Sequence, residues 1–433
     1  MNRLKDSLKN TFLKNVMLIT GGTVFAQIVS TVLLPIITRL YSPEQYGVIS
    51  IYASILMTIS FLGSMNYEMG IPIAESKEKS INVLVLSVIT LVFFTGVITL
   101  AFALFGDAIL ILLNGEVLIK YKYLIPVGIL FLGVYNIFTQ WAYLGKDFKA
   151  ITKTKFTQAI SQNLITIGMG ILGKGPIGLI LGKISGQSAG IYPLFRPLIR
   201  KDRYLLSAVK KKEILWAAKR YIKFPLYTTP RRFLGDITIS LPILLMTSSY
   251  GSHAVGLFGL ANSVIQIPMN LIGTAVSSVF YAESASLRNT DPKRVKELSN
   301  NLLKNLIIIG IVPLVILMFF GPILFSVVFG DSWGEAGVYA SLLSVSVFSR
   351  LVFKPISNIF DVYEKQKLAF LLNIFRVGLV ITVFWVSSYL ELNSYWAVGL
   401  YSMSMAIIYF IQYVLAQKIL IDEIHTFENH SKL

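Results

Sequence analysis

Apolar segments long enough to cross a bilayer constrain this chain more than any other feature. A transmembrane helix needs about 20 apolar residues, and only closed hydrogen-bonded structures are stable in lipid. The chain is 55% hydrophobic and 14% charged, whereas soluble domains carry about 25% charged residues. It is predicted to be an all-α integral membrane protein with twelve transmembrane helices, at 16–38, 48–66, 81–105, 121–143, 156–173, 176–195, 224–250, 254–281, 302–329, 334–361, 367–389 and 394–417.

The distribution of positive charge predicts the orientation of these helices. With both termini in the cytoplasm, the inner loops and tails hold 31 of the 39 Lys and Arg residues, counting those at the cytoplasmic ends of spans, such as Arg231 and Arg232. The outer loops and outer span ends hold four, Arg39, Lys120, Lys122 and Lys174. Because Lys and Arg collect in cytoplasmic loops, we interpret the net charge of +17 as a membrane signal and expect no nucleic-acid partner.

A basic stretch at mid-chain divides the predicted helices into two sets of six. Residues 196–223 form a cytoplasmic linker that is predicted to lie on anionic membrane lipids. The predicted organisation is an N-lobe at 1–195, the linker at 196–223 and a C-lobe at 224–433. A weak repeat at one offset supports it, pairing Thr38, Tyr41, Gly47 and Ser54 with Thr247, Tyr250, Gly256 and Ser263. Six helices per lobe make this a parallel repeat.

Positive side chains inside the predicted spans are the main candidates for a binding site. Apart from cations counted with the loops and span ends, they are Lys183, Arg350, Lys354 and Arg376. A charge at the centre of a transmembrane helix costs about 2.5–3.5 kcal/mol on insertion scales, so such groups usually face a wet cavity or a partner. The excess of cations predicts an anionic cargo.

Each of these cations also has a structural interpretation. Lys183 could extend its ammonium to the membrane interface. Arg350 and Lys354 share a helix face with Asp361, which would allow a ladder of ion pairs, and Pro355 predicts a kink in that helix. Arg376 either binds diphosphate through its planar fork or pairs with Asp236. Arg231 and Arg232 are further candidates for cavity charges.

Polar side chains recur every four residues on three predicted helices. The stripes are Thr23, Gln27 and Thr31; Gln158, Gln162 and Thr166; and Asn262, Gln266, Asn270 and Thr274. Hydrogen bonds between helices explain any one of them. Together with the cations, they predict a hydrophilic chamber whose amides could face sugars, with Gln27, Gln162, Asn262, Gln266 and Asn270 as the candidates.

Glycines on the sixth predicted helix form a stripe of their own. Gly178, Gly182, Gly186 and Gly190 are spaced by four residues, which predicts close packing against a neighbouring helix. The chain has no cysteine, its histidines make no metal-binding spacing, and no enzyme motif lies in the context that its chemistry needs. No metal or cofactor is expected.

Several longer stretches resemble bacterial polysaccharide flippases of Wzx type. They are TRLYSPEQYGVISIY (38–52), FPLYTTP with the segment that follows it (224–264), IPMNLIGTAVSSVFYAESA (267–285), VFGDSWGEAGVYASLL (328–343) and FKPISNIFDVYEKQK (353–367). This family belongs to the multidrug/oligosaccharidyl-lipid/polysaccharide exporter superfamily. The resemblance implies two six-helix lobes around a cationic cavity, where Lys183, Arg350, Lys354 and Arg376 would meet the diphosphate or acidic sugars.

The function implied by the resemblance is the flipping of undecaprenyl-diphosphate-linked oligosaccharides across the bacterial inner membrane. The lipid-linked oligosaccharide would serve O-antigen, lipopolysaccharide or capsule synthesis, with the polymerase machinery as a further partner. The alternative is a cation-coupled multidrug antiporter of the same superfamily, and coupling to H+ or Na+ stays open. A membrane glycosyltransferase or polymerase fits less well, because the predicted outer loops are short. We therefore expect a transporter and not an enzyme.

Overall fold

The computed structural model describes the backbone of residues 2–430 and the side chains of residues 20–429 other than 270, 271, 274 and 275. Every regular element in this part of the chain is helical. The contacts between residues divide the chain into two compact units, Met1–Ser240 and Leu241–Leu433, and each unit is described by itself.

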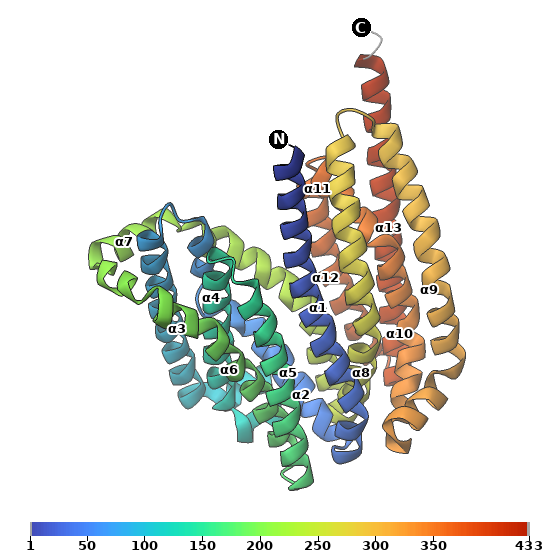
Figure 1. The fold of residues 1–433 in the computed structure, drawn as a ribbon. Helices are drawn as coiled ribbons and strands as arrows, with labels where there is room; N and C mark the ends of the chain where they lie inside the picture. Colours follow the sequence, from blue (N-terminus) through green and yellow to red (C-terminus); the bar gives the residue numbers. More distant parts are fainter. Residues whose placement is uncertain (1, 431–433) are drawn as a thin grey trace. The chain divides into compact units, whose positions relative to one another are not determined.

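The first unit contains seven α-helices and the start of an eighth (Figure 1). They are α1 (Asn2–Leu40), α2 (Pro43–Ile59), α3 (Lys77–Leu112), α4 (Leu124–Leu144), α5 (Phe148–Ile171), α6 (Pro176–Lys201), α7 (Lys211–Arg220) and α8 (Thr229–Leu287). Short 3-10 segments lie at Ser60–Leu62, Tyr67–Ile73, Glu116–Tyr121 and Arg203–Ala208, and a π-helical turn at Phe224–Thr228 precedes α8.

The second unit contains the remainder of α8 and five further helices (Figure 1). These are α9 (Pro292–Phe329), α10 (Gly334–Phe353), α11 (Ile359–Val362), α12 (Gln366–Tyr389) and α13 (Ser394–His430), with 3-10 turns at Asp331–Trp333 and Pro355–Asn358. The kink predicted at Pro355 is confirmed, because α10 ends at Phe353 and a 3-10 turn separates it from α11.

The predicted spans coincide largely with helices, but 48–66, 121–143 and 156–173 each extend past a helix end, and 334–361 is divided by the turn at Pro355. In the part of the chain that the structure describes, nine helices are long and apolar enough to cross a membrane. One of them holds two predicted spans, because α8 continues through residues 224–250 and 254–281 across non-helical backbone at Gly251. The protein is thus a multi-pass helical membrane protein, and the count of twelve crossings stays a prediction.

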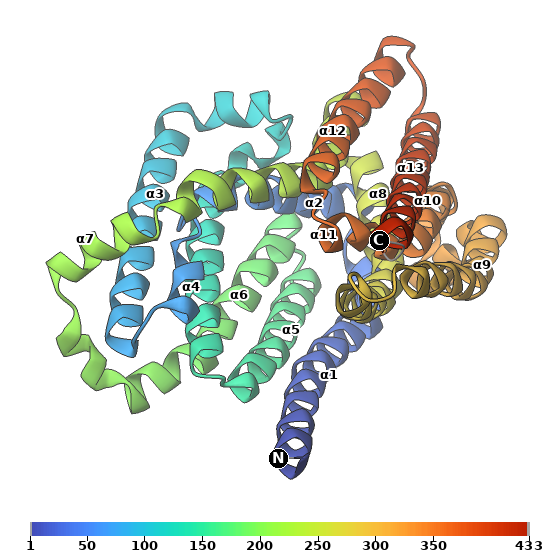
Figure 2. The same ribbon diagram turned by 90° about the horizontal axis from the view of Figure 1, so that it is seen from above.

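The glycine stripe of α6 packs closely on α5, as its spacing predicts. The two helices lie side by side in both ribbon views (Figures 1 and 2). A methyl group added at Gly186 would lie 2.9 Å from Gln162 Cβ, and one at Gly190 would lie 2.7 Å from Gln158 Cγ. Gly178 leaves room for the ring of Tyr41, whose hydroxyl donates a hydrogen bond to the carbonyl of Thr166. A smooth helix surface therefore fixes the α1–α5–α6 contact.

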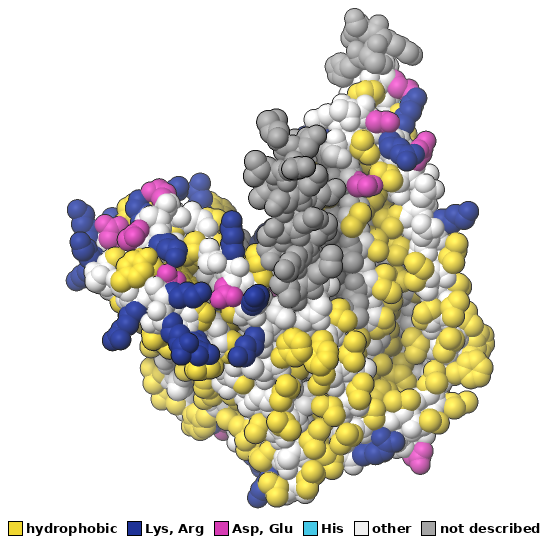
Figure 3. Space-filling view, viewed as in Figure 1, with side chains coloured by type: hydrophobic (Ala, Val, Ile, Leu, Met, Phe, Trp, Pro, Cys, Tyr) yellow, Lys and Arg dark blue, Asp and Glu magenta, His cyan; other side chains and the backbone are white. Residues whose placement is uncertain are grey.

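The basic linker folds against the first unit. Its helix α7 packs on α3, and Lys79 of α3 lies over the ring of Trp216, 4.4 Å from the ring centroid. In Figure 3, Lys and Arg side chains gather on the end of the first unit that carries α7, beyond an apolar flank. The linker is thus a folded basic surface rather than an extended tether.

Candidate functional site

A hydrogen-bonded chain of predicted site residues lies inside the second unit. Arg350 Nη1 on α10 donates to Gln266 Oε1 on α8 at 2.7 Å. Gln266 Nε2 donates in turn to Asn262 Oδ1 at 3.2 Å. All three side chains are half-buried, so the amides orient the guanidinium without neutralising it. Among the described residues no further hydrogen bond of Arg350 is present, which makes its remaining donors candidates for binding a ligand.

Two more predicted cations belong to the same electrostatic group. The charges of Arg376 on α12 and of Arg350 both act on Lys354, which ends α10. Asp361 also acts on Lys354, but none of the three cations forms an ion pair with a described residue. The Nε atom of Arg376 is buried and has no hydrogen-bond partner within the described residues. The group therefore carries positive charge that the described protein does not neutralise.

Two residues that the sequence did not single out complete this group. Tyr401 on α13 lies within electrostatic range of Arg376 and Arg350, and its ring packs against Phe384 with centroids 5.8 Å apart. Asn358 donates to the carbonyl and hydroxyl oxygens of Ser277 at 2.9 and 2.8 Å, which ties the turn after α10 to α8. Asn358 lies four residues after Lys354, so helical spacing could have found it, whereas Tyr401 lies on no polar stripe.

The other predicted polar residues lie in the first unit or outside the described side chains. Gln162 packs on the glycine stripe of α6, which occupies it in helix packing. Gln27 is half-buried on α1, and the side chain of Asn270 lies outside the described residues. Lys183 is half-buried on α6, on a helix face rotated from the glycine stripe, and no hydrogen bond or ion pair joins it to a described residue.

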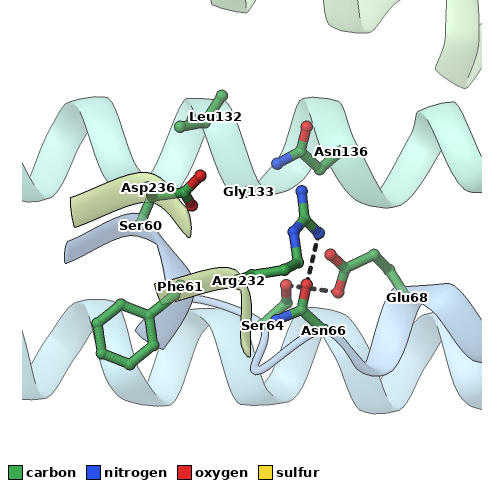
Figure 4. A pocket seen from close by; sticks show the side chains of 10 residues that line it. All are labelled: Ser60, Phe61, Ser64, Asn66, Glu68, Leu132, Gly133, Asn136, Arg232 and Asp236. Carbon is green, nitrogen blue, oxygen red and sulfur yellow. Dashed lines mark hydrogen bonds between the residues drawn. The ribbon is translucent and has the colours of Figure 1, made fainter. Parts of the chain in front are cut away.

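The remaining candidates lie near the start of α8, within the first unit. Arg231 is exposed. Arg232 and Asp236 line a cavity together with polar residues of the α2–α3 connection and α4 (Figure 4). Arg232 acts electrostatically on Asp236. The alternative pairing of Asp236 with Arg376 would join two units that are described separately, so it stays a prediction.

Solved structures define the class of fold. The chain is similar to an inward-facing multidrug resistance MATE transporter of the MOP superfamily, with a TM-score of 0.76, 14% identity and coverage of 92% of this chain and 96% of that one. It is also similar to the lipid II flippase MurJ in an inward closed conformation, with a TM-score of 0.69, 14% identity and coverage of 95% and 91%. A MOP-superfamily transporter from Pyrococcus furiosus matches with a TM-score of 0.55, 14% identity and coverage of 94% and 95%. The chain thus shares the fold of these solved structures.

The family follows from the sequence itself. Residues 36–338, well over half of the chain, match the profile of the polysaccharide biosynthesis protein family. The protein belongs to this family, which confirms the resemblance drawn from its motifs. A comparison with curated proteins finds no significant match.

Proposed function

We propose that this protein is a flippase for an anionic lipid-linked oligosaccharide. Its cargo is an undecaprenyl-diphosphate-linked repeat unit, which it moves across the bacterial inner membrane for O-antigen, capsule or similar polysaccharide synthesis. The observation that carries the proposal is the group of Arg350, Lys354 and Arg376, whose charges lie together and have no ion-pair partner among the described residues. Membership of the polysaccharide biosynthesis family supports the sugar part of the cargo.

The geometry of the group suits a diphosphate better than a single carboxylate. Arginine presents planar pairs of N–H donors that bind two phosphate oxygens at once. Gln266 and Asn262 lie beside Arg350, and such amides can hydrogen-bond to sugar hydroxyls. A cationic site of this kind disfavours a cationic drug, which argues against the multidrug antiporter as the alternative.

The transport cycle in this proposal is alternating access between two six-helix lobes. Both termini and the basic linker stay on the cytoplasmic side, where the linker meets anionic lipid headgroups. The polymerase machinery can receive the product on the opposite side of the membrane. The cargo's polar head crosses along the cationic group while its polyprenyl tail stays in lipid. No covalent step is required.

Complementation tests the proposal. Deletion of the gene should remove surface polysaccharide and leave drug sensitivity unchanged. We expect Arg350→Ala and Arg376→Ala to restore no polysaccharide at normal protein level, and Arg350→Lys to restore part of it, because Lys keeps the charge but loses the fork. Lys304→Ala is the matched control, since Lys304 is an exposed cation on α9 outside the group.

Drug hypersensitivity with intact polysaccharide in the deletion strain would refute the flippase and favour the antiporter. Full complementation by both Ala variants would refute the assignment of the cationic group.

A further inference from the structure

The cavity in the first unit holds charges that the proposed cationic group does not use. Ser64, Asn66 and Glu68 reach it from the segment between α2 and α3, Asn136 from α4, and Arg232 and Asp236 from α8 (Figure 4). Glu68 and Asp236 are the titratable groups that line the cavity, and Arg232 is the cation that lines it. The α4 side contributes the neutral Asn136 and apolar atoms.

Hydrogen bonds in this cavity join the start of α8 to the α2–α3 connection. Arg232 Nη1 donates to Asn66 Oδ1 at 2.5 Å, and Asn66 Nδ2 donates to Thr229 Oγ1 at 2.9 Å. Thr229 Oγ1 then donates to the carbonyl of Met65 at 2.9 Å. Asn66 takes a left-handed backbone conformation with φ of 60°, which Asn tolerates better than most residues. Asn66 is therefore the acceptor that holds Arg232 in place.

Glu68 is the buried group that this network leaves without a charge partner. Its side chain is 4% exposed, and its Oε2 accepts a hydrogen bond from Ser64 Oγ at 2.6 Å. Arg232 acts on Glu68 at longer range, but its hydrogen bond goes to Asn66 and not to either carboxylate. An ionised carboxylate buried in this way is costly. Glu68 lies outside the candidate spans, and burial raises its pKa although Ser64 and Arg232 oppose the shift.

We propose that Glu68 is a proton-binding site and that its proton decides whether Arg232 is bound by Asn66 or by Glu68. With the proton bound, Glu68 is neutral and Arg232 stays on Asn66, as in the structure. When the proton leaves, the carboxylate becomes the stronger acceptor for a guanidinium in the same cavity. Arg232 then exchanges partners, and the link between Asn66 and the start of α8 is broken.

A proton fits this cavity better than a metal ion. A metal ion would need several free oxygen ligands, yet Asn66 Oδ1 already accepts from Arg232 and Glu68 Oε2 already accepts from Ser64. The positive charge of Arg232 would also repel it. A proton needs one carboxylate oxygen. Since α8 begins the second half of the chain, the exchange would couple proton binding to the transport cycle, and this last step rests on the proposed flippase function.

Thermal unfolding of the purified protein tests the site without any cargo. The pKa of Glu68 in the folded state lies above the value of about 4.3 in an unfolded chain, so the folded state keeps the proton where the unfolded state has lost it. Stability is therefore fully present at low pH and falls as pH rises through the folded pKa. We expect the unfolding midpoint of the wild type to be lower at about pH 8 than at about pH 5.

Matched variants assign this effect. Glu68→Gln should remove the drop, and Glu75→Gln should keep it, because Glu75 is an exposed acid in the same connection that pairs with Lys79. Difference infrared spectra of the wild type supply a second measurement if Glu68→Gln does not fold: the band of a protonated carboxyl should appear on acidification and persist in Asp236→Asn.

Three results would overturn the proton site. The first is a drop in unfolding midpoint with rising pH that survives in Glu68→Gln. The second is a carboxyl infrared band that is lost in Asp236→Asn. The third is an unfolding midpoint that rises on replacing K+ by Na+ at fixed pH only when Glu68 is present, which would identify sodium as the ion. Because these measurements need no cargo, a flippase that fails in complementation leaves them standing, and their failure leaves the flippase standing.

Discussion

Because α6 packs closely on α5, we predict that three glycine-to-alanine variants will differ in stability according to the space around each added methyl group. A methyl group at Gly186 would lie 2.9 Å from Gln162 Cβ and 3.1 Å from the backbone oxygen of Gln158, whereas carbon atoms in contact prefer about 3.5–4.0 Å. The backbone oxygen cannot turn away, so the helices must separate. At Gly190 the nearest atoms, at 2.7–3.0 Å, all belong to the movable side chain of Gln158. At Gly96 on α3 nothing lies within 4 Å.

The magnitudes follow from two opposing effects. Overpacking costs about 1–3 kcal/mol, while alanine gains up to about 1 kcal/mol in helix propensity over glycine. Gly96→Ala should be neutral or stabilising, Gly190→Ala intermediate, and Gly186→Ala should lower the free energy of unfolding by about 1–3 kcal/mol relative to Gly96→Ala. Unfolding midpoints in detergent should follow that order, and Gln158→Ala should rescue Gly190→Ala but not Gly186→Ala. Equal midpoints for all three variants would show that the close helix contact does not exist.

A double-mutant cycle on Arg350→Ala and Gln266→Ala should give a coupling energy of about 0.6–1.7 kcal/mol in unfolding free energy, the range for hydrogen bonds between membrane helices; additive effects would mean that the 2.7 Å contact is absent in solution. Replacing three exposed basic residues of 196–223 by Glu should abolish salt-sensitive binding of the protein to anionic vesicles, at about 1 kcal/mol for each charge removed. Unchanged binding in that variant would contradict the lipid-facing linker.

Hydropathy was enough to locate most of the long helices. The repeat offset in addition pairs two positions at which the helical backbone is interrupted. At that offset Ser42 corresponds to Gly251. Ser42 is the N-cap that separates α1 from α2, and Gly251 is the non-helical residue, with φ of 74°, between the two spans of α8. Both breaks in helical backbone thus fall at positions that the repeat offset pairs. Matches of a few residues can therefore report on backbone geometry.

Helical periodicity says which residues share a face but not what that face meets. Gln162 and Gln266 lie on similar polar stripes, yet Gln162 packs on glycines of α6 while Gln266 binds Arg350. The difference depends on the neighbouring helix, which the stripe itself does not encode. Glu68 escaped notice for another reason. It lies in a short connection between spans, where an acid is usually solvated, and only the fold buries it.

Without their proposed ligands, the two candidate sites would carry uncompensated charges of opposite sign, and this suggests how they could work together. The group at Arg350, Lys354 and Arg376 has surplus positive charge, whereas the cavity at Glu68 has two carboxylates and one guanidinium. Moving an uncompensated charge through a membrane interior is costly. In the proposed cycle, an anionic cargo would neutralise the first site and a proton would neutralise the second, so each ligand would lower the cost of rearranging the helices that carry it. We therefore expect the protein that carries both cargo and proton to change between its transport conformations faster than the protein that carries neither. This difference in rate would couple cargo transport to proton transport without requiring the two ligands to touch.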